Sequence, residues 1–455
     1  MLEKLIGKRF DNDEMPSFSY GTSLKQEIAT FNYLKDLDDG IFPIEEVACD
    51  CGADIDSFEI IAKKDRYGIN CQTVICKNCG MVMTNPRMTQ EGYNLFYDKY
   101  YRLIYTGSDV ASDEFFDDQC RHGQIIYSIL CDNIEMNKIS NVLEIGCGAG
   151  GILMPFKENG KKVKGIDLGS SYIKYGIEQG LDLENINSKE LLSKGIKYDL
   201  IILSHVAEHF LDINSELSCI YDLLADNGKL YIEVPGINSI TINGNYNGNI
   251  LTYLQNAHVR HFSLNSLVQL MSKNGFKLIL GDEQIASIFE KGFMTSYSID
   301  NYNDTINSLI NMEKKYLEFF QDSESIMYEN ARLKQEQEYS EIWIDNINNG
   351  QLIAPYLIKN KYNQIAIYGN GQLVNLLIME LSKFNFKIDY LITHNTEFKI
   401  DYSGYPIYTI HDDLPDTDAI IVVEPFVSTL IRRYLNTKKY IQIIPIGKIL
   451  LELSK

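Results

Sequence analysis

One stretch of the chain, residues 142–167, constrains the fold more than any other; it reads VLEIGCGAGGILMPFKENGKKVKGID. An apolar run typical of a buried strand stops at three alternating glycines. A helical pattern follows, and then a second short strand, 163–166, which ends at Asp167. Glycines at a strand-to-helix turn let a ligand approach the backbone and leave the first N–H groups of the helix free. The stretch therefore predicts a βαβ unit that binds a nucleoside.

The spacing of the glycines and one carboxylate indicate which nucleoside this is. Gly146, Gly148 and Gly150 follow the pattern G-x-G-x-G, whereas a dinucleotide fold uses G-x-G-x-x-G to receive a pyrophosphate. Glu144 would repel a pyrophosphate, but it can face a cationic amino-acid ligand. Asp167 can accept hydrogen bonds from both hydroxyls of a ribose. A positively charged nucleoside fits this pattern, and a degenerate NAD site is the alternative.

With these residues the chain resembles the class I S-adenosylmethionine-dependent methyltransferases, whose E-x-G-x-G-x-G motif begins here at Glu144. The segments 198–210 and 220–236 resemble the fourth strand of that family and the helix, turn and strand after it. The resemblance implies S-adenosylmethionine as cofactor. The residues that it places around this cofactor are Glu144, Gly146, Gly148, Gly150, Asp167, Leu168, Ser204, Tyr97 and Tyr101. From the residues alone, the two tyrosines fit the packing face of an amphipathic helix equally well.

Five of the nine cysteines lie between residues 49 and 79, and this clustering favours a metal over disulfides. The run C-K-N-C-G from Cys76 has the spacing of a zinc knuckle, and C-D-C-G from Cys49 is its partner, one residue shorter than usual. The chain between the two pairs alternates like a hairpin. The predicted ligands of a closed, structural zinc site are Cys49, Cys51, Cys76 and Cys79. Cys71 is an alternative ligand if the Cys49 spacing is too tight, and a set of free buried thiols is the other alternative.

A zinc module just before such a domain resembles the bacterial methyltransferases of sugar and surface-polysaccharide biosynthesis, of which sugar C-methyltransferases of deoxysugar pathways are the best known. The segment 64–101 is very like the end of their zinc module. The resemblance implies an α/β protein with an N-terminal zinc-binding module, a central class I methyltransferase fold and a second, Rossmann-like domain. The expected parts are an extension (1–45), the zinc module (46–100), the methyltransferase domain (101–285), a helical connector (286–355) and the C-terminal domain (356–455). The implied substrate is a sugar carried on a nucleotide.

Three histidines are the candidate catalytic residues, namely His258, His205 and His261. Methyl transfer to a hydroxyl or an activated carbon needs a base, and the pKa of histidine suits that task. In the resemblance, His258 aligns with the base of the sugar C-methyltransferases. The preceding residues, Gln255 to Ala257, replace the Tyr, His and Glu of that family. This departure leaves O-methylation at least as open as C-methylation.

Each of these histidines also has a structural alternative. The segment around His258 and His261 can be a loop pinned to the sheet, and His205 can simply cap the next helix. Glu208 and His209 are expected to hold their loop in place rather than react. Arg260 is a candidate partner for a substrate phosphate.

The C-terminal third repeats the order of strand, glycine turn and helix, with Gly369 and Gly371 at the turn. Later strands are expected at 419–426 and 440–446, and amphipathic helices over 300–350. The tip of the second strand carries Thr393, His394 and Asn395 rather than an acid. The sequence therefore predicts a Rossmann-like domain without a redox cofactor of its own, which helps to hold a nucleotide sugar.

Composition excludes several classes of partner. A net charge of −20 disfavours DNA and RNA, and no apolar stretch reaches the ~18 residues that a membrane span needs. The N-terminus lacks the apolar centre of a signal peptide, so a cytoplasmic protein is expected. Two rival functions remain, a non-catalytic nucleotide-sugar-binding protein and a nicotinamide-dependent enzyme that uses the C-terminal domain.

Overall fold

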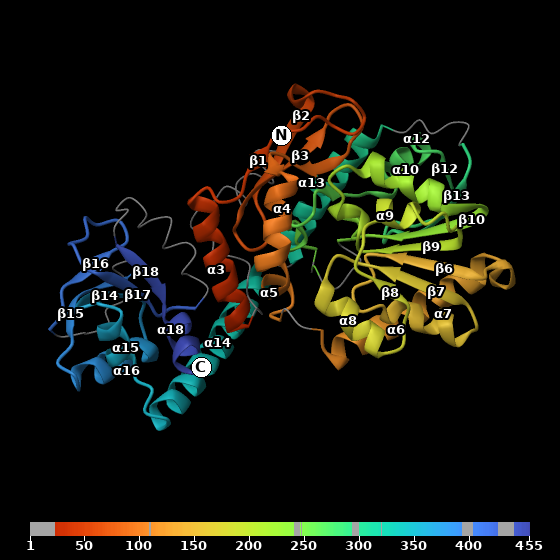
Figure 1. Ribbon diagram of the computed structural model, residues 1–455. Helices are drawn as coiled ribbons and strands as arrows, with labels where there is room; N and C mark the ends of the chain where they lie inside the picture. Colours follow the sequence, from red (N-terminus) through yellow and green to blue (C-terminus); the bar gives the residue numbers. More distant parts are fainter. Residues whose placement is uncertain are drawn as a thin grey trace.

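The computed structural model describes residues 23–108, 111–240, 246, 248–293, 300–319, 321–393, 404–425 and 441–455. Two α/β bodies lie at opposite ends of the molecule (Figure 1). The cysteine-bearing module and the helices α3 (Leu24–Asp38) and α14 (Gln321–Asn348) lie between them. Among the described residues, no helix is long and apolar enough to cross a membrane.

The larger body contains a seven-stranded sheet in the order β12-β13-β10-β9-β6-β7-β8. Its strands are β6 (Asn141–Ile145), β7 (Lys162–Ile166), β8 (Leu183–Glu184), β9 (Tyr198–Ser204), β10 (Leu224–Glu233), β12 (Phe276–Leu280) and β13 (Ala286–Lys291). The strands β6 to β10 are parallel to one another. The direction in which successive strands are added reverses between β6 and β9, and doubly wound sheets bind ligands at such a reversal. β13 is antiparallel to both of its neighbours.

Helices cover both faces of this sheet (Figure 1). One face carries α6 (Asp113–Asn133), η4 (Gly151–Leu153), α7 (Met154–Glu158) and α8 (Ser170–Glu178). The other carries α9 (Ser188–Leu192), α10 (Ile213–Leu223) and α12 (Leu264–Lys273). Central strands covered on both faces read as continuous apolar runs, and the four residues 200–203 of β9 are fully buried.

One predicted boundary is wrong. The methyltransferase domain was expected to end at residue 285, but β13 follows at once and pairs with β10 over five residues, from Lys229↔Glu290 to Glu233↔Ala286. The sheet therefore extends into the segment expected to be a helical connector. The six residues ASIFEK carry too short a pattern to reveal a strand, and their pairing with β10 and β12 defines one.

The cysteine-bearing module is built on the predicted hairpin. β2 (Phe58–Lys64) pairs with β3 (Asn70–Cys76), and β3 pairs with β4 (Val82–Thr84). The fourth strand of this sheet is β11 (Arg260–His261), which pairs with β4. β11 belongs to the chain segment of the larger body, between β10 and α12. A small ladder joins β1 (Ile44–Glu45) to β5 (Arg87–Met88). Because Cys49, Cys76 and Met83 pack in the same core cluster as residues of β6, β9 and β10, the module and the larger body share a core.

Short helices follow the module along the chain, namely α4 (Gln90–Phe96), the π-helix η2 (Tyr97–Tyr101) and α5 (Arg102–Tyr105). α11 (Ile250–Tyr253) precedes β11. The amphipathic helices expected over 300–350 are present as α13 (Asn301–Phe319) and α14.

The smaller body has a five-stranded, all-parallel sheet in the order β16-β15-β14-β17-β18. Its elements are β14 (Gln364–Tyr368), β15 (Lys387–Thr393), β16 (Ile407–Thr409), β17 (Ala419–Val422), β18 (Gln442–Pro445), α15 (Ile353–Lys359), α16 (Gln372–Ser382) and α18 (Ile446–Leu453). β17 and β18 fall within the two late strands predicted from the sequence. His394 and Asn395 lie outside the described residues.

Candidate functional site

The glycine loop joins β6 to η4 at the carboxyl edge of the sheet. Gly146 and Gly148 have φ angles of 72° and 56°, in the left-handed region that favours glycine. A Cβ atom at Gly146 would lie 2.4 Å from Cγ2 of Val206, so no other residue fits there. Gln119 of α6 fixes the far side of the loop, since its amide donates to the carbonyl of Cys147 and accepts from the N–H of Gly151. The loop is thus a rigid cradle for a ligand.

Asp167, at the tip of β7, holds this cradle to the next turn. Its Oδ2 accepts a hydrogen bond from the N–H of Gly148 at 2.9 Å, and its Oδ1 accepts from the N–H of Gly169 at 2.6 Å. Each oxygen keeps a second lone pair for a ribose hydroxyl. Leu168 follows at the rim, with its side chain largely exposed.

Glu144 lies beneath the glycine loop and is only 1% exposed. Its Oε2 is buried and makes no hydrogen bond. Burial raises the pKa of this carboxyl well above its usual value, and the nearby carboxylates of Asp167 and Glu233 raise it further. Buried polar atoms nearly always have partners, so this orphaned oxygen fits a cationic ligand such as S-adenosylmethionine.

Glu233 ends β10 and gathers groups from three elements. Its carboxylate accepts hydrogen bonds from Ser204 at 3.0 Å and Tyr231 at 2.7 Å, and it pairs with Nε2 of His122 at 2.5 Å. Nε2 of His205 lies 3.3 Å away. Burial raises the pKa of Glu233, but the two histidines outweigh it and hold that pKa well below its usual range.

The carboxylates around His205 favour its protonated form. Desolvation lowers its pKa, but the carboxylates of Glu208 and Glu233 raise it to about 10. An imidazolium cannot accept a proton, so His205 is poorly suited to act as a base. His122 was missed by the sequence reasoning, because a single histidine on the long helix α6 carries no motif; only the fold brings it to Glu233.

The second cluster surrounds Glu208, whose two carboxylate oxygens are buried without hydrogen-bond partners. Ring nitrogens of His205, His209 and His258 lie 3.8, 3.8 and 3.9 Å from its Oε1. His258 is 4% exposed, and burial, together with the positive charges around it, lowers its pKa well below the usual value. The backbone of His258 is fixed by Thr84, whose hydroxyl donates to its carbonyl at 2.8 Å. Glu208 and His209 hold their loop as expected, since Nδ1 of His209 lies 2.9 Å from the carbonyl of Ala257 and the carbonyl of Glu208 accepts from the N–H of Val259, and they also border the candidate site.

Tyr97 and Tyr101 face this cluster and also pack against each other. The hydroxyl of Tyr97 lies 2.9 Å from Nδ1 of His209, and the two tyrosine rings are 4.8 Å apart. Burial raises the pKa of Tyr101 to about 12, with Glu208 and Asp167 adding to the effect. The packing role of the two tyrosines is therefore present, and their contact with the cofactor stays a prediction.

His261 lies behind His258, with the two rings 5.8 Å apart. It is 2% exposed, its Nδ1 makes no hydrogen bond, and burial lowers its pKa to about 3. The candidate role of Arg260 is wrong, because its guanidinium is buried in an ion pair with Asp50 and is not available to a substrate phosphate.

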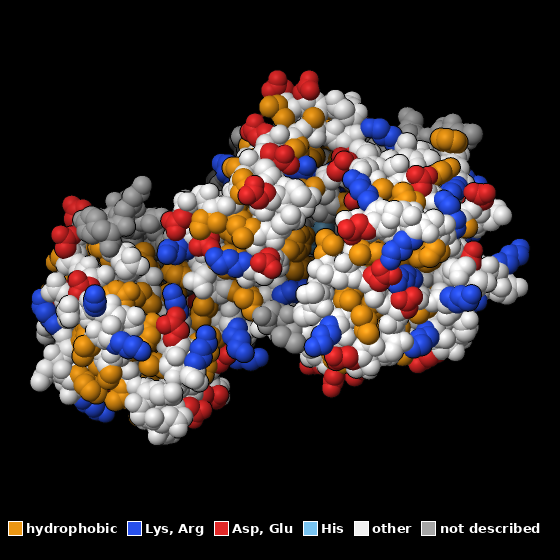
Figure 2. Space-filling model, viewed as in Figure 1, with side chains coloured by type: hydrophobic (Ala, Val, Ile, Leu, Met, Phe, Trp, Pro, Cys, Tyr) orange, Lys and Arg blue, Asp and Glu red, His pale blue; other side chains and the backbone are white. Residues whose placement is uncertain are grey.

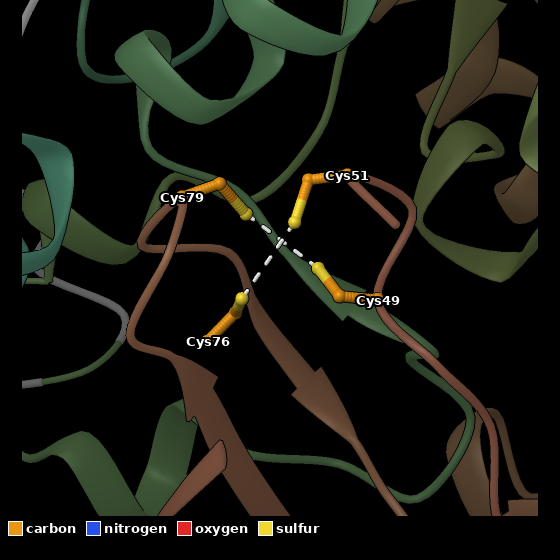
Figure 3. Close-up of side chains that lie close together, drawn as sticks. All are labelled: Cys49, Cys51, Cys76 and Cys79. Atoms are coloured by element: carbon orange, nitrogen blue, oxygen red, sulfur yellow. Dashed lines mark hydrogen bonds between the residues drawn. The ribbon is translucent and has the colours of Figure 1, made fainter. Parts of the chain in front are cut away.

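The sulfurs of the four predicted cysteine ligands point toward a common centre (Figure 3). Sγ of Cys49 lies 3.5 Å from Sγ of Cys79, and Sγ of Cys51 lies 3.8 Å from Sγ of Cys76. Thiolates at about 2.3 Å from a tetrahedral zinc ion would be about 3.8 Å apart, so the residues fit this metal. Cys71 lies outside the group, with its sulfur 3.9 Å from the hydroxyl of Thr84.

Comparisons with known proteins agree with the fold of the larger body. Residues 125–280 match a family model described as a methyltransferase domain. The ubiquinone biosynthesis O-methyltransferase of Bartonella quintana is 27% identical over 97 residues, which are 20% of this chain and 39% of that protein. That of Pasteurella multocida is 30% identical over 106 residues, 20% of this chain and 44% of that protein. The chain thus spans less than half the length of these curated relatives.

Solved structures resemble the same region at a low level. The 1,6-didemethyltoxoflavin-N1-methyltransferase of Burkholderia thailandensis aligns with a TM-score of 0.34 and 17% identity, over 47% of this chain and 96% of that one. A SAM-dependent methyltransferase from Archaeoglobus fulgidus gives 0.30 and 21%, over 45% and 93%. From the family match and the glycine loop, the larger body is a class I S-adenosylmethionine-dependent methyltransferase domain.

Proposed function

We propose that this protein transfers a methyl group from S-adenosylmethionine to a sugar carried on a nucleotide, in the biosynthesis of a surface polysaccharide or a deoxysugar. The observation that supports S-adenosylmethionine as the cofactor is the buried, unpartnered Oε2 of Glu144 beneath the glycine loop. When bound, the cofactor supplies an activated methyl group on a positively charged sulfur. Glu144 faces its cationic amino-acid end and Asp167 holds its ribose.

His258 is the proposed base. Its imidazole is neutral at physiological pH, because burial depresses its pKa, so its ring can accept the proton that the acceptor loses. The carboxylate of Glu208, 3.9 Å from Nε2 of His258, stabilises the imidazolium that forms. In this proposal His205 is protonated, so it contacts the cofactor or the acceptor without serving as a base. The rest of catalysis is alignment of the acceptor with the methyl group.

The other parts of the chain have supporting roles in this proposal. One zinc ion, held by the four clustered cysteines, stabilises the N-terminal module, which has little core of its own. The C-terminal body acts as a Rossmann-like domain that helps to hold the nucleotide. Four of the nine cysteines would hold zinc as thiolates and none of the nine is in a disulfide, which fits a reducing, cytoplasmic location.

A phenol is the second candidate acceptor. The curated relatives are named as ubiquinone biosynthesis O-methyltransferases. The aromatic residues Tyr97 and Tyr101 beside His209 also offer faces on which a ring can stack. This candidate keeps the same cofactor site and the same base, and it changes only the acceptor.

Two measurements test the proposal in order. Calorimetric titration with S-adenosylhomocysteine should show one site per chain in the wild type and much weaker binding in Glu144→Gln. Incubation with labelled S-adenosylmethionine and a panel of nucleotide sugars and catechols, read by mass spectrometry, then identifies the acceptor. Failure of the wild type to bind S-adenosylhomocysteine would contradict the enzyme proposal. Methylation of catechols alone would replace the sugar by the phenol.

A further inference from the structure

The hairpin turn between β2 and β3 docks onto the segment that leads to His258. The N–H of Arg66 donates to the carbonyl of Leu254 at 2.9 Å. The carboxylate of Asp65 accepts from the N–H groups of Tyr67, Ile69 and Asn256 at 2.9–3.0 Å. These contacts fix the backbone of Arg66 relative to the catalytic histidine.

The side chain of Arg66 is a half-buried cation, and no carboxylate among the described residues pairs with it. Its guanidinium lies over the rings of Tyr67 and Tyr105, 5.0 and 5.3 Å from their centroids, and one NH2 group donates to Oε1 of Gln255 at 3.1 Å. Its Nε is buried and makes no hydrogen bond. The neighbouring Asp65 does not pair with it, since both of its oxygens already accept backbone N–H groups. A half-buried guanidinium whose Nε is buried and unused is unusual in the absence of a carboxylate or phosphate.

The partner of Arg66 adjoins the candidate base, because the backbone carbonyl of Gln255 accepts a hydrogen bond from the N–H of His258 at 3.0 Å. In agreement with this position, the charge of Arg66 contributes to the depressed pKa of His258 and opposes the rise in the pKa of Tyr101. Its partner Gln255 stands where the sugar C-methyltransferases that this chain resembles have a tyrosine. In place of that tyrosine, the pair of Arg66 and Gln255 presents a positive charge and a side-chain amide next to each other.

We propose that Arg66 and Gln255 form a subsite for an oxyanion of the acceptor, and that this oxyanion is a phosphate of the nucleotide sugar. The subsite rests on the proposed function, since it names the charge that the acceptor carries. A planar guanidinium binds two phosphate oxygens at once. A chain of net charge −20 needs a local cation to accept such a ligand, and acidic and basic side chains are scattered over the visible face rather than gathered into one basic surface (Figure 2). The carboxylate of a sugar acid offers the same chemistry.

The test is a titration of the full-length protein, with and without saturating S-adenosylhomocysteine, using uridine diphosphate and glucuronate as probes. The wild type should bind uridine diphosphate, and Arg66→Gln should weaken that binding at least tenfold. Arg66→Lys keeps the positive charge but loses the paired N–H donors of the guanidinium, so its affinity for uridine diphosphate should lie between those of the wild type and Arg66→Gln. Lys63→Gln, at an exposed position of β2 just before the turn that carries Arg66, should bind like the wild type. The affinity for S-adenosylhomocysteine should be the same in all four proteins.

The outcomes separate the subsite from the proposed function. Arg66-dependent binding of glucuronate alone would keep the oxyanion site and assign it to a sugar acid. Unchanged binding in Arg66→Gln, or no binding of either probe by the wild type, would overturn the proposal. Loss of S-adenosylhomocysteine binding in the wild type would instead contradict the enzyme proposal. If Arg66→Gln does not fold, Gln255→Glu gives the same test, because its carboxylate would pair with Arg66 and should exclude both probes.

Discussion

The guanidinium of Arg260 donates two hydrogen bonds, 2.6 and 2.7 Å long, to the carboxylate of Asp50, which stands between two of the clustered cysteines. The same guanidinium donates to the carbonyl of Phe210, next to His209 in the chain. Arg260 is also two residues from His258, and it is 2% exposed. One side chain therefore links the cysteine site to the chain segments of two of the three histidines around Glu208, His209 and His258.

Replacing this arginine by lysine should destabilise the protein by about 3 kcal/mol, because a broken buried pair leaves the charge of Asp50 poorly compensated. Chemical denaturation measures this change. Turnover should fall, while binding of S-adenosylhomocysteine stays as in the wild type. Arg121→Lys is the matched control, since Arg121 pairs with Asp118 at an exposed site and its loss should cost less than about 1 kcal/mol. Equal effects of the two variants would contradict the coupling.

Elemental analysis of the purified protein should find one zinc ion per chain. Cys76→Ser should lose the metal and lower the melting temperature, because metal binding and folding of such a module are coupled. Cys71→Ala should keep the metal, since the sulfur of Cys71 lies outside the group of four. Loss of zinc from Cys71→Ala together with its retention in Cys49→Ala would show that the ligand set is different.

Glu144→Gln should bind S-adenosylhomocysteine about 10- to 100-fold more weakly and yet unfold at a higher temperature. The buried carboxylate has an oxygen without a partner, and a neutral amide is cheaper to bury. Thermal unfolding without ligand, combined with calorimetry, checks both effects. Glu158→Gln, at an exposed position of α7, should change neither quantity.

His258→Asn should lower turnover about 100-fold or more, the usual contribution of a general base, without changing cofactor affinity. The pH profile gives a second reading. A histidine of ordinary pKa would lose half of its activity near pH 6.5. Because the pKa of His258 is depressed, it stays neutral at lower pH, and the acid limb of the wild-type profile should lie below that value.

Acid should destabilise the fold through His261. Its pKa is about 3 in the folded chain and about 6.5 when unfolded, so between these values the unfolded state binds the extra proton and stability falls with falling pH. His261→Leu removes this contribution. As the pH falls from 6 to 4, the free energy of unfolding of His261→Leu, relative to that of the wild type, should rise by about 1.4 kcal/mol per pH unit. Parallel stability curves for the two proteins would contradict this explanation.

The local parts of the site could be predicted from the sequence. The glycine loop, the strand that ends at Asp167 and the β2–β3 hairpin each depend on residues within about 30 positions of one another, and their patterns are specific. The zinc ligand set was predicted in the same way, from the spacing of two short cysteine pairs, and the sulfur positions are compatible with it.

The rest of the site depends on contacts between distant segments. His122 and Glu233 are 111 residues apart, and Arg260 and Asp50 are 210 apart, so neither pair leaves a pattern in the chain. A phosphate was a reasonable partner for Arg260 only because its true partner belongs to another domain. Burial acts in the same way, since the neutral state of His258 comes from packing that the sequence does not encode locally.

The two residues of β11 have a consequence for how such proteins can evolve. Arg260 and His261 form the fourth strand of a sheet whose other three strands lie before residue 85. Recombination at the end of the N-terminal module would therefore transfer three strands, and the receiving protein would have to provide the fourth. Exchange of this module between relatives should therefore succeed only when the matching dipeptide travels with it, and the two segments are expected to be inherited as one unit.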